Sequence, residues 1–347
     1  MNSHISKAKN AKPLIKKKKR KWLRSILAIA AFLFIFILLF SIFTPIPASL
    51  MIRTAFKNGI AVAPNNYEAI KETVTVTNDL NYPSKYKDNS ADIYIPKNKE
   101  GLFPVVLWVH GGAFVGGDKR DIEIYATALA SEGIAVVCIN YQRAPEAKYP
   151  TPIIQMEEAY LWLKNISNEY SIDINRLILA GDSAGAHIAA QFAAIQSNTS
   201  YANEMAMNQI VPLNTIKSIL LFCGPFDVAK IAENNNSLIN FFMERAAWAY
   251  FGKKNWNEQF SFQATISNHI TDNFPPAFIT DSNTLSFEEH AKNLAGVLKK
   301  NNVPVETYFI PINVEETAHE YQFVMNTPSA EESFKKTVSF IKKYAEP

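Results

Sequence analysis

The stretch LILAGDSAGAHI, residues 177–188, decides the fold. Its apolar run 177–180 predicts a short buried strand, and the pattern from Ala186 to Ile195 predicts a helix. Between them, GDSAG has the form Gly-x-Ser-x-Gly. A strand–turn–helix of this kind is so tight that the residues two before and two after the serine must lack bulk. The pattern predicts that Ser183 stands on the rim of a sheet as a nucleophile, although the pentapeptide alone is also compatible with a turn that only starts a helix.

The rest of the chain supplies the context that this motif needs. Apolar runs alternate with amphipathic segments, and the run 104–109 is apolar throughout, as strands buried on both faces are. The expected strands are 72–77, 91–96, 104–109, 134–139, 176–180, 216–222, 274–280 and 305–310, and the expected helices are 121–131, 151–170, 184–197, 286–301 and 331–344. This alternation predicts a doubly wound, mostly parallel α/β sheet of about eight strands.

One long segment, at about 228–273, interrupts the alternation. It is rich in aromatic side chains, and a connection of this length in an α/β fold usually has a function. We expect a cap-like insertion over the site, although packing of these aromatic side chains on the core is an equally good interpretation for most of them.

The N-terminus has a different composition from the rest. Residues 1–24 hold ten Lys and Arg and no acid, and 26–43 is an 18-residue run with one serine and no charge. As a helix this run would be about 27 Å long, close to the hydrocarbon thickness of a bilayer. We therefore predict a basic cytoplasmic tail (1–24), a transmembrane anchor (25–44), a juxtamembrane segment (45–69) and an extracytoplasmic catalytic domain (70–347) in the cell membrane, crossed once.

A cleaved signal peptide is the alternative to a retained anchor. Pro-Ala-Ser at 47–49 would permit cleavage, but an apolar core of 18 residues is longer than the roughly 7–15 of a signal peptide. Beyond the tail, 25 basic side chains face 32 acidic ones, a net charge of −7. The sequence therefore predicts a membrane contact through 26–43 and no nucleic-acid partner.

The two cysteines are expected to be buried thiols without a catalytic role. Cys138 and Cys223 each lie in an apolar run that predicts an interior strand. A free cysteine in such a place behaves as a small apolar side chain.

A serine nucleophile needs donors for an oxyanion and a base. HGGAF at 110–114 directly follows the strand 104–109, and such a glycine loop turns backbone N–H groups toward the serine. We expect the N–H groups of Gly112, Ala113 and Ala184 to form the oxyanion hole. For the base, His319 follows the last strand in a polar loop, where the chain order Ser, acid, His requires it.

Five spaced motifs resemble the hormone-sensitive-lipase-like branch of the α/β-hydrolases. They are also similar to bacterial esterases related to feruloyl and acetyl-xylan esterases. The motifs are HGGAF at 110–114, YQRAPEAKYP at 141–150, GDSAG at 181–185, PPAFI at 275–279 and HEYQF at 319–323. The resemblance implies an α/β-hydrolase fold, Ser183 as nucleophile, His319 as base, ester hydrolysis through an acyl-enzyme, and no metal or organic cofactor.

The sequence departs from this family at the acid. By ungapped count the family's aspartate falls on Leu285, which cannot orient an imidazole. The nearest carboxylates are Asp281 at the strand end and Glu288 and Glu289 on the next helix, and Asp227 follows the preceding strand. We favour Asp281 with Asp227 as the alternative, and expect a small shift of the backbone to bring Asp281 to His319.

The function predicted from these residues is that of a membrane-anchored serine carboxylesterase. It would hydrolyse short- to medium-chain acyl esters, either small molecules or acyl groups linked to a polymer. Two alternatives remain: a serine amidase or peptidase that uses the same residues, and a catalytically impaired protein of the hydrolase fold that serves as a binding or scaffolding module.

Overall fold

The computed structural model describes residues 6–57, 59–97, 100–233 and 236–345. The chain divides into two compact units, residues 1–48 and residues 49–347. In the first unit, α1 (Ser6–Phe40) covers most of the run predicted as an anchor, and it ends at Phe40 rather than at Phe43. Among the residues described, no helix is both long and apolar enough to cross a membrane. The anchor and its topology stay predictions.

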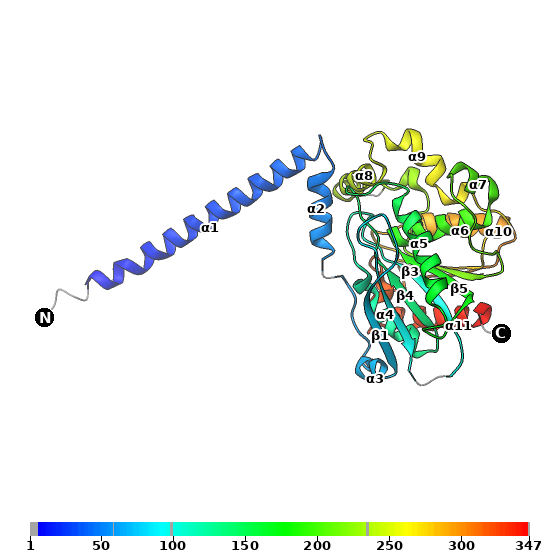
Figure 1. The fold of residues 1–347 in the computed structure, drawn as a ribbon. Helices are drawn as coiled ribbons and strands as arrows, with labels where there is room; N and C mark the ends of the chain where they lie inside the picture. Colours follow the sequence, from blue (N-terminus) through cyan, green and yellow to red (C-terminus); the bar gives the residue numbers. More distant parts are fainter. Residues whose placement is uncertain (1–5, 58, 98–99, 234–235, 346–347) are drawn as a thin grey trace. The chain divides into compact units, whose positions relative to one another are not determined.

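Eight strands of the second unit form one sheet in the order β1-β2-β4-β3-β5-β6-β7-β8. Figure 1 labels β1, β3, β4 and β5 of this sheet. The β1–β2 and β2–β4 pairs are antiparallel, and the pairs from β4 to β8 are parallel. The strands are β1 (Val74–Asn81), β2 (Ser90–Pro96), β3 (Phe103–Val109), β4 (Ala135–Ile139), β5 (Ile172–Asp182), β6 (Ile216–Phe222), β7 (Ala277–Asp281) and β8 (Val305–Phe309). The predicted α/β sheet of about eight strands is confirmed.

Helices cover both faces of this sheet, because its central strands are apolar on both faces. Val105 and Leu107 pack with one set of helices, α5, α6 and α10, while Val106 and Trp108 pack with the other set, α4 and α11. The helices are α2 (Ile46–Ala55), α3 (Tyr67–Glu72), α4 (Glu123–Ser131), α5 (Thr151–Ile166), α6 (Ala184–Ser197), α7 (Thr199–Glu204), α8 (Ser237–Phe251), α9 (Trp256–Ala264), α10 (Glu288–Lys300) and α11 (Pro328–Ala345).

The interrupting segment 228–273 contains α8 and α9 with short 3₁₀ turns at Val228–Lys230 and Ile266–Asn268. Much of α8 packs into the core through Ala246, Ala247 and Tyr250. Many of its aromatic side chains therefore serve packing, the second of the two interpretations given by the sequence.

Both cysteines are free and buried. Cys138 lies in β4, and Cys223 follows β6 directly. Burial raises the pKa of each thiol well above its usual value, so both stay protonated at neutral pH.

Candidate active site

Ser183 stands on the tight turn between β5 and α6. Its φ of 49° and ψ of −119° are a strained backbone conformation for a residue other than glycine, and its N–H donates to the carbonyl of Phe222 at 2.7 Å. A Cβ at position 181 would lie 2.4 Å from the carbonyl carbon of Gly185, and one at position 185 would lie 2.0 Å from the carbonyl oxygen of Val109. Both positions flanking the serine therefore require glycine, as the sequence pattern predicted.

The glycine loop 110–113 leaves β3 beside this turn, since Val109 pairs with Gly181 in the sheet. Gly112 has a φ of 107°, and a Cβ there would lie 2.4 Å from the backbone of Gly116. Within the described part of the chain, the N–H groups of Gly112 and Ala113 have no hydrogen-bond partner. The loop thus leaves two backbone donors unused, next to the first N–H of α6 at Ala184, which no carbonyl of its own helix can satisfy.

The histidines near the loop and behind the serine have structural surroundings. His110 is buried, its Nδ1 bonds the Gly111 carbonyl oxygen at 2.7 Å, and its ring stacks on Tyr141. His187 is buried on α6, where its Nε2 bonds the carbonyl oxygen of Ala264 at 2.7 Å. Burial lowers the pKa of both rings to about 4, so both are neutral at pH 7.

His319 lies in the loop after β8, and its Nε2 is 3.0 Å from Ser183 Oγ. Burial lowers the pKa of this imidazole to about 4, so it is neutral at pH 7 and can accept a proton. The structure thus brings Ser183 and His319 together at hydrogen-bond distance, as a nucleophile and its base require.

The other nitrogen of His319 does not meet a carboxylate. Nδ1 is 2.7 Å from the hydroxyl of Ser286, which in turn donates a hydrogen bond to Asp281 Oδ1. Asp281 is fully buried at the end of β7 and also accepts the Ser282 N–H at 2.8 Å. The direct contact of Asp281 with His319 expected from the sequence is replaced by a contact through Ser286, because β7 ends too early for the carboxylate to reach the ring.

Ser286 was not predicted from the sequence, because a serine is not an acid. The signal that could have found it is its place directly after Leu285, the position where the family's aspartate falls. Leu285 itself has a φ of 50° and is 55% exposed, so the chain turns its side chain toward solvent.

The other candidate acids pair elsewhere. Asp227 lies 3.6 Å from Lys230 Nζ and accepts from the Thr265 hydroxyl at 3.4 Å. Glu288 and Glu289 both pair with Lys292 on α10, at 3.1 and 3.0 Å. The structure does not bring these three carboxylates to His319.

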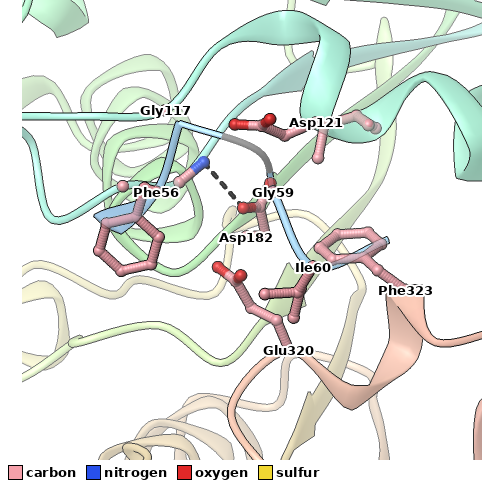
Figure 2. A pocket seen from close by; sticks show the side chains of 11 residues that line it. Phe56, Gly59, Ile60, Gly117, Asp121, Asp182, Glu320 and Phe323 are labelled. Carbon is pink, nitrogen blue, oxygen red and sulfur yellow. Dashed lines mark hydrogen bonds between the residues drawn. The ribbon is translucent and has the colours of Figure 1, made fainter. Parts of the chain in front are cut away.

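Two further buried carboxyl groups, those of Asp182 and Glu320, lie beside the glycine loop 110–113 (Figure 2). Asp182 accepts from the Trp108 Nε1–H at 2.7 Å and from the Gly111 N–H at 2.8 Å, the bond drawn dashed in the figure. Burial raises the pKa of Asp182 to about 6, and burial with the neighbouring Asp182 raises that of Glu320 well above its usual value. A second negative charge beside Asp182 is disfavoured in this buried place, so Glu320 holds its proton more firmly than an exposed glutamate does.

Glu320 and Asp182 line a cavity of about 20 Å³ together with Gly112 and Asp121. Figure 2 shows Asp121, Asp182 and Glu320 around it. This volume holds about one water molecule. The cavity is too small for a substrate. A separate groove of about 610 Å³ passes Ser286 and is lined in part by Leu285, Phe287 and Ile312.

The oxyanion loop also contacts the inserted segment. The ring of Phe114 stacks on Tyr250 of α8, with centroids 4.0 Å apart and planes 9° apart. Its edge meets the His187 ring of α6 at 5.6 Å. Phe114 is thus held between α8 of the inserted segment and α6, the helix that follows Ser183.

Among the described residues, Cys223, Asp281 and His319 bring one sulfur, one oxygen and one nitrogen within 4.8 Å of one another. This spacing could hold a metal ion. Each group is already engaged: Cys223 Sγ accepts the Glu320 N–H, Asp281 accepts from Ser286, and His319 contacts Ser183 and Ser286. The donor set fits a hydrogen-bonded chain better than a metal centre.

The model of the BD-FAE family matches residues 91–287, more than half of the 347 residues. The chain belongs to the BD-FAE family. This agrees with the resemblance to α/β-hydrolase esterases found in the motifs. The match begins in β2 and ends just after Ser286, so His319 lies beyond it.

Individual relatives of this BD-FAE member are similar over shorter stretches. Isoprenylcysteine alpha-carbonyl methylesterase ICME of Arabidopsis thaliana is 36% identical over 102 residues, 29% of this chain and 24% of that protein. The probable carboxylic ester hydrolase LipM of Mycobacterium tuberculosis is 24% identical over 204 residues, 58% of this chain and 46% of that protein. This chain spans less than half the length of either relative.

Solved structures share the fold over most of this BD-FAE member. Esterase B from Lactobacillus rhamnosis superimposes with a TM-score of 0.71 at 19% identity, covering 83% of this chain and 89% of that one. A bacterial heroin esterase gives a TM-score of 0.66 at 20% identity, covering 85% and 97%. The α/β-hydrolase fold is therefore established for this chain.

Proposed function

We propose that this protein is a serine carboxylesterase that hydrolyses short- to medium-chain acyl esters through an acyl-enzyme. The contact of Ser183 Oγ with His319 Nε2 at 3.0 Å, on a strained turn flanked by obligatory glycines, carries the proposal. Two relatives are named as esterases or ester hydrolases, and the family and fold agree with the same chemistry.

The proposed reaction begins with attack of Ser183 Oγ on the ester carbonyl carbon. The hydroxyl proton moves to His319 Nε2 as the new carbon–oxygen bond forms, and the carbonyl electron pair becomes an oxyanion. The N–H groups of Gly112, Ala113 and Ala184 are the proposed donors to that oxygen. The proton on His319 then passes to the departing alcohol, and water repeats the sequence to release the acid.

The groove that passes Ser286 supports the substrate proposal as a surface near His319, although Ser183 is not among its lining residues. Its apolar side chains, Leu285, Phe287 and Ile312, suit an acyl chain or an apolar alcohol, whether the ester is a small molecule or linked to a polymer.

Membrane anchoring is part of the proposal and is supported by the first unit and the sequence. Apolar side chains of α1 such as Leu27, Phe32 and Phe36 are more than half exposed, and ten basic residues precede them. We propose a retained anchor at 26–43 with the N-terminus in the cytoplasm. Protease added to intact cells that express the full chain should digest residues 49–347 and leave the N-terminal tail protected. A protected catalytic unit, or release with a new N-terminus near Ser49, would contradict it.

Activity is tested with p-nitrophenyl butyrate and a fluorophosphonate probe on the full chain. The wild type should turn over the ester and become labelled, whereas Ser183→Ala should do neither. Loss of the nucleophile lowers kcat by a factor on the order of 10⁶ in well-studied serine hydrolases. An unlabelled, inactive wild type would favour the scaffolding alternative, and turnover of an amide instead of the ester would favour an amidase.

A further inference from the structure

Four side chains of the site are connected in series by hydrogen bonds, and we call this series the line. Ser183 Oγ meets His319 Nε2 at 3.0 Å, His319 Nδ1 meets Ser286 Oγ at 2.7 Å, and the Ser286 hydroxyl meets Asp281. Resting on the proposed function, we propose that Ser286 is a positioning residue that links His319 to the charge of Asp281. It would do for the imidazole what a directly bonded carboxylate does in other serine hydrolases.

The direction of each hydrogen bond follows from the number of hydrogens available. The Ser286 hydroxyl has one hydrogen, and it is donated to Asp281 Oδ1. Toward His319, Ser286 Oγ can therefore only accept, so the ring proton must lie on Nδ1. This leaves the Nε2 lone pair free to take the proton of Ser183. An ionised Asp281 thus selects the tautomer of His319 that catalysis needs.

Protonation of Asp281 reverses this order. A protonated carboxyl can donate to Ser286 Oγ, and the Ser286 hydroxyl then donates to His319 Nδ1. The ring proton moves to Nε2, facing Ser183, where it blocks general-base catalysis. The Ser286 hydroxyl therefore transmits the protonation state of Asp281 to His319 Nε2, the nitrogen that faces Ser183.

The loops that carry Ser286 and His319 are joined to each other, which fixes the geometry of the line. The Asn283 side chain donates to the carbonyls of Ile310 and Glu315, each at 2.8 Å, and accepts the Thr317 N–H at 3.0 Å. A backbone bridge also pairs Thr284 with Ala318. These contacts between the two loops fix the position of Ser286 relative to His319.

The chemistry of His319 requires a partner of this kind. Burial alone lowers the pKa of its imidazole to about 4, which makes it a weak base. The imidazolium formed during attack needs a stabilising negative charge. Asp227, Glu288 and Glu289 are paired with lysines. Glu320 lies 3.7 Å from Nε2, but burial and the neighbouring Asp182 raise its pKa well above its usual value and disfavour its charged form. Asp281 receives donors from Ser286 and Ser282, which suits its charged form.

The test compares kcat for p-nitrophenyl butyrate and the rate of fluorophosphonate labelling across a double-mutant cycle. Ser286→Ala and Asp281→Asn should each lower both rates at least tenfold with little change in KM. In the double variant, kcat and the labelling rate should lie within about threefold of those of the less active single variant, because the two residues act through one line. Ser286→Thr keeps the hydroxyl and should retain most of the rate.

Ser218→Ala is the matched control. Its hydroxyl is buried near the start of β6, at the end of the strand away from the site, and has no hydrogen-bond partner among the described residues. This variant should keep the wild-type rate. Thermal unfolding of each variant reports on folding. If Ser286→Ala does not fold, Asp281→Asn and Ser286→Thr still test the proposal.

The pH profile provides a readout that a merely structural role would not move. Burial raises the pKa of Asp281 to about 7, so kcat/KM of the wild type should rise with pH through about 7 as the carboxylate forms. Other titratable groups near the ring are Glu320, whose Oε1 is 3.7 Å from Nε2, Asp182 and the Cys223 thiol. If the rise of kcat/KM through pH 7 is lost in both Asp281→Asn and Ser286→Ala, this rise comes from Asp281 acting through Ser286 and not from the neighbouring groups.

Three results would overturn the inference: Ser286→Ala within threefold of the wild-type rate, losses of the two single variants that multiply in the double variant, or equal losses in Ser286→Ala and Ser286→Thr. In each case a wild type still labelled at Ser183 would leave the proposed esterase function intact. A wild type that is not labelled at all would instead contradict the proposed function.

Discussion

Gly181 and Gly185 position Ser183 because they have no side chains, whereas Asp281 reaches His319 only through a side chain of another residue. On the nucleophile side, backbone atoms of β3, β5 and α6 approach so closely that an added Cβ would lie as near as 2.0 Å to a carbonyl oxygen. On the acid side, a loop places a hydroxyl between a carboxylate and a ring.

The nucleophile side and the acid side of the site therefore tolerate substitutions differently. Close backbone packing admits one residue type, so the nucleophile side is rigidly specified by sequence. A hydrogen-bonded side chain can be replaced by another group that reaches the same atom, so the acid can move along its loop while the fold stays the same.

The largest effect is expected from Gly185→Ala. The new Cβ would lie 2.0 Å from the Val109 carbonyl oxygen and 2.6 Å from that of His110, both of them backbone atoms that cannot yield without moving β3. We expect a loss of stability above about 4 kcal/mol, or no folded protein, with activity abolished. Thermal unfolding and labelling at Ser183 measure both.

Gly296→Ala is the control for that substitution. Gly296 lies in α10 with no heavy atom within 4 Å of the added Cβ, so the change should stabilise the protein by up to about 1 kcal/mol. A folded, active Gly185→Ala protein would show that the nucleophile side is less constrained than the comparison holds.

A smaller effect is expected from Asp182→Asn, still on the nucleophile side. The Trp108 indole and the Gly111 N–H donate to different oxygens of the carboxylate, and in asparagine one of these oxygens is replaced by an NH2 group that cannot accept, so one of the two bonds is lost. We expect a destabilisation of about 1–3 kcal/mol and a lower kcat, because Gly111 leads into the oxyanion loop. Urea unfolding and ester turnover measure these.

The exposed Glu331→Gln, which breaks only a surface pair with Lys335, should cost less than about 1 kcal/mol. If Asp182→Asn keeps the wild-type kcat, the carboxylate of Asp182 does not set the geometry of the loop 110–113.

The smallest effect concerns the pH dependence of stability on the acid side. Asp281 has its pKa raised by burial to about 7 in the folded protein, against an ordinary value of 3.8. The folded state therefore holds its proton longer than the unfolded state, and the group's contribution to stability falls as pH rises from about 4 to about 7. Asp281→Asn should remove this fall.

Urea unfolding at pH 5 and pH 8 measures the difference between the variant and the wild type. Asp182 and Asp121, whose pKa values burial raises to about 6, act with the same sign and remain in both proteins. An identical pH dependence in the two proteins would mean that Asp281 is ionised throughout this range. The variant should thus gain relative stability at pH 8 while it loses activity.

Much of the nucleophile side could be predicted from the sequence because its signals are local. The strand before Ser183, the glycines around it and the loop 110–113 each follow from neighbouring residues, and the structure has them as predicted. The position of His319 followed from chain order. Its contact with Ser183 depends on loops 136 residues apart in sequence, yet the strand ends bring them together.

The acid side could not be predicted in the same way. Asp281 was the favoured acid, but its distance from His319 depends on where β7 ends and on the turn at Leu285. The role of Ser286 depends on the joined loops 283–286 and 315–319, which no local pattern reveals. The predicted anchor likewise depends on surroundings that lie outside the chain.

The stacked rings of Phe114 and Tyr250 make the inserted segment a mechanical partner of the reaction centre. Phe114 follows Ala113, one of the proposed oxyanion donors, and Tyr250 lies near the end of α8. The Tyr250 carbonyl also accepts the Tyr149 N–H at 2.7 Å, which ties α8 to the body of the protein. A graft that replaces 228–273 to change substrate access would therefore also move the proposed oxyanion donors, so we expect selectivity and turnover to change together.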